Sequence, residues 1–141
     1  RRILTIVADP RAIGSGCEEA PALTDAEAVA RRIRSDPDLD ATAPVPVSIG
    51  GIPALQVDVV MTDAPECSWQ LPGFSSGTPL LLKNAPFVLP GQNWARLYLL
   101  DLPGGSGGVL AIAICSSEED HERALEVAAP IVDSIRFRAG P

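Results

Sequence analysis

The sequence predicts an α+β domain in which a curved, mainly antiparallel β-sheet has its apolar face covered by two helices. Short runs of alternating apolar residues are joined by Gly-rich turns, which favours antiparallel strands because parallel neighbours need longer crossovers. Two segments, beginning near residues 24 and 117, instead repeat apolar residues with the period of an α-helix. The 141 residues, of which 46% are hydrophobic and 21% charged, suit one domain spanning residues 1–141.

The amino-terminal part predicts a strand followed by a helix. Residues 3–7 form a β-rich run that ends at Asp9-Pro10. Thr24 to Glu27 then match a capping box, in which the Thr24 hydroxyl accepts from the Glu27 amide. The apolar positions that follow at helical spacing are Ala26, Val29, Ala30 and Ile33. Three arginines, Arg31, Arg32 and Arg34, suit the carboxyl end of the helix dipole, and Pro37 ends the helix.

A hairpin follows this helix. Residues 45–49 and 55–62 alternate in the manner of strands, and Gly50-Gly51 between them supply the positive φ angles of a tight turn. Pro53 has no N–H, so the second strand is expected to begin after it or to lie at an edge there.

Residues 63–93 form an irregular insertion rich in proline and glycine. Residues 80–83 and 87–89 are its two candidate strands, both short. Irregular stretches of this length are uncommon in compact domains and are often either functional or mobile.

The carboxyl-terminal part predicts two strands and a helix. Residues 96–102 and 109–115 have strand patterns, and the Gly-rich linker at 104–108 joins them as a hairpin tip. Ser117 caps the last helix, with Asp120 in the capping-box position. Its apolar face comprises Ala124, Val127, Ala128, Ile131, Val132 and Ile135. Pro130 is expected to kink or divide this helix, and residues 135–137 to end the chain as a short strand.

Charge and hydropathy exclude two classes of partner. Lys and Arg number 11 against 18 Asp and Glu, a net charge of −7, whereas nucleic acids and anionic membrane surfaces attract basic proteins. The longest apolar run, residues 109–115, is far shorter than the about 20 residues of a membrane helix. We therefore expect no nucleic-acid partner and no direct membrane insertion of this fragment.

Two segments carry a resemblance to known domains. The sequences APVPVSIGGIPALQVDV at 43–59 and AAPIVDSIRF at 128–137 resemble uncharacterised extracytoplasmic domains of high-GC bacteria. Some of those domains are attached to sensor, β-propeller or lipoprotein-like chains. The wider layout, over most of residues 24–137, is similar to the Mog1/PsbP-like α/β/α sandwich fold. This resemblance implies a non-enzymatic binding module and carries over no catalytic residues.

The cysteines and the chain ends bear on compartment. We predict a Cys17–Cys67 disulfide, which would stabilise the fold by roughly 4 kcal/mol through chain entropy; the alternative is three reduced thiols, Cys115 included. No cysteine pair has metal-ligand spacing and His121 is distant, so no metal site is expected. The chain begins at Arg1 and its only methionine is Met61, so we expect a trimmed, secreted or membrane-anchored, extracytoplasmic fragment.

Candidate catalytic groups have simpler explanations. His121 lies at an acidic helix start without a nucleophile beside it, and the glycines at 104–108 precede a strand rather than the helix of a phosphate-binding loop. Asp58 and Asp101 could perform acid–base chemistry, but pairing with Arg96 or another basic residue is the expected role. We therefore expect no enzyme and no cofactor.

Four aromatic residues are the candidate binding site: Trp69, Phe74, Phe87 and Trp94. They could line a hydrophobic groove or anchor a partner, or they could pin the long insertion onto the sheet. The sequence thus predicts an interaction domain that binds a protein partner. Its alternative is a small-ligand sensor or carrier with an apolar pocket between sheet and helices.

Overall fold

The computed structural model describes residues 3–8, 11–12, 25–35, 39–61, 80–82, 85–86, 94–102 and 108–137. Its elements, in chain order, are β1 (Ile3–Ala8), β2 (Arg11–Ala12), α1 (Ala26–Ser35), β3 (Leu39–Ala41), β4 (Val45–Ile49), β5 (Ile52–Met61), β6 (Leu80–Leu82), β7 (Ala85–Pro86), β8 (Trp94–Asp101), β9 (Val109–Ser116) and α2 (His121–Asp133). The predicted strands at 3–7, 96–102 and 109–115 are confirmed, as are the two helices.

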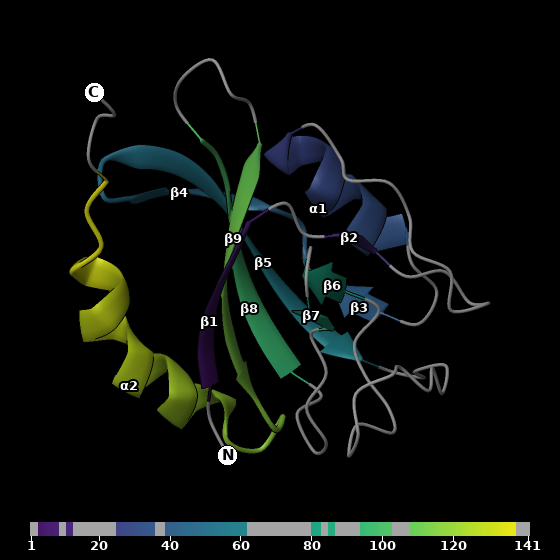
Figure 1. Cartoon of the computed structure of the whole chain (residues 1–141). Helices are drawn as coiled ribbons and strands as arrows, with labels where there is room; N and C mark the ends of the chain where they lie inside the picture. Colours follow the sequence, from purple (N-terminus) through teal and green to yellow (C-terminus); the bar gives the residue numbers. More distant parts are fainter. Residues whose placement is uncertain are drawn as a thin grey trace.

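The main sheet is antiparallel throughout the described strands. Its order is β1-β9-β8-β5-β3, and β4 pairs with the same edge of β5 as β3 does (Figure 1). Strands β2, β6 and β7 pair in a second, smaller sheet. The protein therefore belongs to the α+β class.

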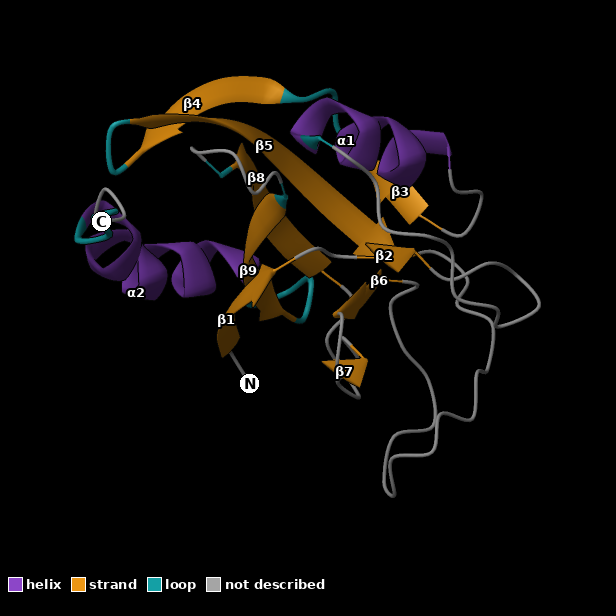
Figure 2. Cartoon of the chain, turned by 45° about the horizontal axis from the view of Figure 1, so that its top comes forward, coloured by secondary structure: helices purple, strands orange, loops and turns teal. Residues whose placement is uncertain are grey.

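The helices lie on opposite sides of the main sheet (Figures 1 and 2). Helix α1 packs on β3, β5 and β8 and shares an apolar cluster with the odd-numbered β9 residues Ala111 and Ala113, whereas α2 packs on β9 in the cluster of Ile112 and Ile114. The sheet consequently has two apolar faces rather than the single one that its strand patterns suggested. Neither α1 nor α2, the helices of the described residues, has the length and apolar character of a membrane-spanning segment.

Both helices begin at polar side chains. At α1 the Ala28 amide donates to Asp25 Oδ1 over 2.7 Å, while Thr24, the expected cap, lies outside the described residues. The predicted Ser117 cap of α2 is wrong, because Asp120 occupies the N-cap position without a side-chain capping hydrogen bond. Ser117 lies in the turn before the helix, where its carbonyl and its Oγ both accept from the Asp120 amide, over 3.2 and 3.3 Å.

The β4–β5 hairpin turns on two glycines. Gly50 has φ of 57° and Gly51 has φ of 83°, which confirms the expected turn. Strand β5 starts at Ile52, earlier than expected, and so includes Pro53. Pro53 pairs with Ser48 of β4, whereas the pairing of β5 with β8 begins only at Ala54. The proline thus lies where one side of its strand is unpaired, as its missing N–H requires.

One extra residue separates β3 from β4. Ala41 pairs with Val59 and Val45 pairs with Gln56, so residues 42–44 face only the two residues between those partners. This geometry is a β-bulge. The Thr42 amide donates to the Asp58 carbonyl over 2.9 Å, and Thr42 Oγ1 accepts from the Asp58 amide over 3.0 Å. The bulge reverses which face the odd-numbered residues take: Leu39 packs toward α1, but Val47 and Ile49 pack toward α2.

Some expectations require correction, and others fall outside the described residues. Pro130 does not divide α2, because it lies in the last turn of a continuous helix and removes a single hydrogen bond there. Residues 135–137 are not a strand, and β3 went unpredicted. The candidate strand at 87–89 and both cysteines of the predicted disulfide, Cys17 and Cys67, fall outside the described residues.

Alanine substitutions in the turn test the contact between the hairpin tip and the carboxyl-terminal tail. A Cβ at Gly50 would lie 2.8 Å from the Ile135 carbonyl oxygen, whereas a Cβ at Gly51 would meet nothing within 4 Å. Both changes strain a positive φ, but only Gly50→Ala also displaces the tail. We expect urea unfolding to show losses of about 2–4 kcal/mol for Gly50→Ala and about 1–2 kcal/mol for Gly51→Ala. Equal losses would contradict the close contact.

Candidate functional site

Of the four aromatic residues in the predicted site, the structure describes Trp94, and this residue lies in the interior. Trp94 is 5% exposed at the start of β8, and its ring centroid lies 4.8 Å from that of His121, with 36° between the rings. His121 Nδ1 is 2.6 Å from the Glu118 carbonyl oxygen, to which it donates. Trp94 and His121 therefore join β8 to the start of α2. Trp69, Phe74 and Phe87 lie outside the described residues.

The candidate acid–base carboxylates do not meet. Asp58 faces Arg96 across β5 and β8, and Arg96 Nε and the second guanidinium nitrogen donate to its two oxygens over 2.7 and 2.9 Å. The hydrogen bond to Asp58 raises the pKa of Arg96, as does the negative charge of that carboxylate. Asp101 Oδ1 accepts from the Ala26 amide over 2.8 Å, at the start of α1. The expected Asp58–Arg96 pairing is confirmed, and each carboxylate has a structural partner.

The remaining chemical groups of the described chain are structural as well. Cys115 is a free thiol, 2% exposed, and burial raises its pKa to about 12. A thiol that stays protonated is neither a nucleophile nor a metal ligand at neutral pH. Among the described residues, no group of three or more His, Cys, Asp or Glu side chains gathers as a metal site.

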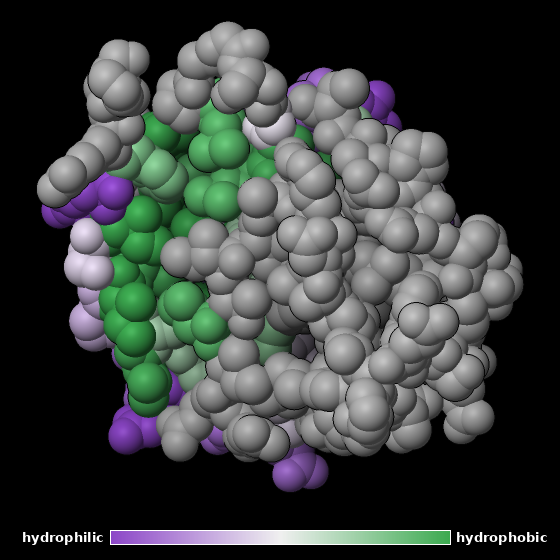
Figure 3. Space-filling model, in the orientation of Figure 1, coloured by the Kyte–Doolittle hydropathy of each residue, from purple (hydrophilic) through white to green (hydrophobic). Residues whose placement is uncertain are grey.

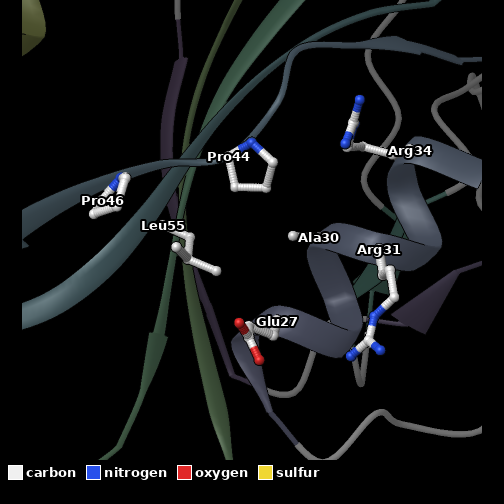
Figure 4. Close-up of a pocket in the computed structure, with 7 residues that line it drawn as sticks. All are labelled: Glu27, Ala30, Arg31, Arg34, Pro44, Pro46 and Leu55. Atoms are coloured by element: carbon white, nitrogen blue, oxygen red, sulfur yellow. The ribbon is translucent and has the colours of Figure 1, made fainter.

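A groove lies between α1 and β4 on the described surface. It has a volume of about 440 Å³, and Figure 4 shows the helix side chains on one side and the prolines of the strand segment across from them. Its lining residues are Glu27, Ala30, Arg31, Arg34, Pro44, Pro46 and Leu55. On α1 these positions recur at the i, i+3, i+4 and i+7 spacing of one helix face, next to the face that packs on the sheet.

The groove continues toward the start of α1. An adjoining hollow of about 200 Å³ shares Glu27, Pro46 and Leu55 with the first and extends to Pro53 and Asp101. Together they form what we call the α1–β4 groove. Its floor is apolar, its carboxylates lie toward the amino end of α1, and its guanidinium groups lie toward the carboxyl end.

The guanidinium groups of the groove have no partner within the described residues. Arg31 and Arg34 are exposed, and neither makes a hydrogen bond or an ion pair there. By contrast, Arg96 binds Asp58, and Arg123 binds Glu126 over 3.0 Å. In the part of the chain that the structure describes, two positive charges thus border an apolar floor without a counter-charge.

The free edge of β4 offers little main-chain hydrogen bonding. Among the described strands β4 pairs only with β5, and the two-residue turn makes Ile49 and Ile52 a hydrogen-bonded pair. Alternation then directs the backbone groups of Val47 toward β5 and those of Pro46 and Ser48 toward the free edge. Pro46 has no N–H, so an added strand could not form a regular ladder here. Side chains must therefore hold any occupant of the groove.

Sequence reasoning missed this groove. It assigned Arg31 and Arg34 to the helix dipole, and the prolines at 44 and 46 only to a family-like segment. The recurrence of Glu27, Arg31 and Arg34 at i, i+4 and i+7 was a usable signal of a second, charged helix face.

A smaller apolar surface lies on α2. Val127 and Ile131, one helical turn apart, are 48% and 50% exposed. Figure 3 shows apolar atoms gathered along this side of the molecule. Nothing in the described structure covers these two residues, and they carry no charged group that would orient a ligand.

The chain matches no protein-family model and no curated protein.

Protection of the Cys115 thiol gives a direct test of its surroundings. At pH 9 the folded thiol stays protonated, whereas an unfolded cysteine near its ordinary pKa is largely thiolate. We expect iodoacetamide to modify Cys115 about 100-fold or more slowly in the folded protein than in urea, by mass spectrometry of its peptide. Because burial raises the pKa of Cys115 in the folded protein, the neutral thiol stabilises the fold at pH values below the pKa of the unfolded thiol. This stabilisation is lost as the pH rises toward 12. Rapid native labelling would contradict the burial.

Proposed function

We propose that the chain is a non-enzymatic interaction domain that acts outside the cytoplasm, within a secreted or membrane-anchored protein. Its partner would occupy the α1–β4 groove. The observation that carries this proposal is an apolar floor bordered by two arginines that have no partner among the described residues, since binding sites combine apolar surface with a few polar groups that orient the ligand.

The placement of the reactive groups supports binding over catalysis. Asp58, Asp101, Cys115 and His121 each have a structural role in the described residues, and none of them is joined by a nucleophile and a base at reacting distance. The groove instead contains arginine, glutamate, proline and aliphatic side chains, which recognise a surface by charge and shape.

A small-ligand sensor or carrier is the second candidate. The volume of about 440 Å³ falls within the range of small-molecule pockets, which is the observation that favours it. Native mass spectrometry of freshly purified protein separates the candidates, because a retained small molecule would support the sensor and a bare chain the interaction domain.

The proposal includes a fold of the Mog1/PsbP-like α/β/α type. The order of helix, glycine hairpin, antiparallel strands and terminal helix supports it, as does the position of the helices on opposite sides of the sheet.

Blocking the groove tests the proposed site. Peptides selected from a random display library on the folded, ¹⁵N-labelled protein should shift the amide resonances of Ala30, Val47 and Leu55. Pro46→Trp, which fills the groove from an exposed position, should weaken their binding at least about tenfold, or 1.4 kcal/mol. The matched control is Val127→Trp, at an equally exposed site on α2, which should leave affinity unchanged. Failure to select any peptide, or shifts that cluster on α2, would refute the site.

Thiol counting tests the proposed compartment. Disulfides persist outside the cytoplasm, so the protein isolated from its native host should carry the Cys17–Cys67 bond. Alkylation in denaturant without reductant should then modify Cys115 alone. Modification of all three cysteines would remove the support that a disulfide gives to an extracytoplasmic location.

A further inference from the structure

We infer that the partner presents an extended segment of alternating acidic and apolar residues. Its acidic side chains would meet Arg31 and Arg34, and its apolar side chains would lie on Pro46 and Leu55. This inference rests on the proposed function and adds the chemistry of the partner to it.

Charge complementarity is the first argument. The protein has a net charge of −7, yet the groove presents two guanidinium groups that have no partner in the described residues. Arginine binds carboxylates through a planar fork of donors. A basic or neutral segment would leave both groups unpaired, whereas an acidic one would pair them close to an apolar surface, where salt and water screen less.

The shape of the lining is the second argument. Arg31 and Arg34 stand on the helix side, and Pro44 and Pro46 lie across the groove from them (Figure 4). In an extended chain successive side chains point in opposite directions. A segment lying along the groove would therefore direct alternate residues toward the arginines and toward the floor formed with Leu55.

Pro46 of β4 distinguishes this mode of binding from strand addition. A partner that joined β4 as a further strand would need donors along its free edge, and Pro46 supplies none. The affinity would then come mainly from side chains, so it should depend strongly on the arginines and on salt concentration.

The charges also set an order along the segment. Glu27 lines both hollows and Asp101 lines the one toward the amino end of α1. Acidic residues of the partner are repelled there and attracted toward Arg31 and Arg34. The acidic residues of the segment would thus lie toward the carboxyl end of α1.

Three synthetic peptides test the inference. They share the same apolar residues at every second position, and the positions between are all aspartate in the first peptide, asparagine in the second and lysine in the third. Fluorescence anisotropy should show the aspartate peptide binding at least about tenfold more tightly than the asparagine peptide, and the lysine peptide most weakly. Affinity for the aspartate peptide should fall as sodium chloride is raised.

Charge variants locate the effect. Arg31→Glu and Arg34→Glu should each weaken the aspartate peptide about tenfold, whereas Glu27→Gln should strengthen it about threefold. The matched control is Arg123→Glu, which makes the same charge change at an exposed arginine on α2 and should alter affinity less than about twofold. The Glu27→Gln variant tests the role of charge without the risk that misfolding explains the result, because a gain of affinity requires a folded groove.

The outcomes separate this inference from the proposed function. If the asparagine or lysine peptide binds as tightly and still shifts the resonances of Ala30 and Leu55, the groove is a binding site and the acidic partner is wrong. An equal loss in Arg123→Glu would also overturn the inference, because it would reflect net charge alone. If none of the three peptides and no library peptide binds at the groove, the proposed function fails with it.

Discussion

Strand β9 can stay hidden from water only if another layer lies on each side of the sheet, because apolar residues occupy both of its faces. Residues 111–116 of this strand are all buried, and the alternate positions belong to two separate clusters. Helix α1 completes one cluster and α2 the other. The antiparallel neighbours β1 and β8 complete its hydrogen bonding. Helix α1 takes its place in the first cluster by packing on β3, β5 and β8, and this packing positions one wall of the groove.

Much of the fold was predictable because its signals are local. Helical spacing identified both helices, and Gly50-Gly51 identified the hairpin, since few other residues accept two positive φ angles. The second apolar face was missed although the unbroken apolar run at 109–115 is typical of a strand buried on both sides. Strand β3 was missed because it is short and two of its neighbours in sequence are acidic. The effect of Pro130 on α2 was overestimated, since a proline disrupts a helix least near its ends.

The candidate site was less accessible to sequence reasoning, because it depends on which distant residues become neighbours. The Asp58–Arg96 pair could be anticipated from charge in two strand patterns. The α1–β4 groove joins a helix to an edge strand through tertiary packing, and whether Arg31 and Arg34 are paired depends on that packing as well. Aromatic composition drew attention to Trp94, but its large ring is buried where β8 meets the start of α2.

The bulge between β3 and β4 has an evolutionary consequence. A shift of one residue in the pairing of a strand turns its side chains to the opposite face of the sheet. Because the Gly50-Gly51 turn fixes the pairing of β4 with β5, an in-frame deletion of one codon within 42–44 would leave Pro46 in the groove lining and would instead turn β3 over, taking Leu39 away from the α1 cluster. Lineages that shorten this segment would therefore lose a core contact of α1 while they kept the β4 side of the groove.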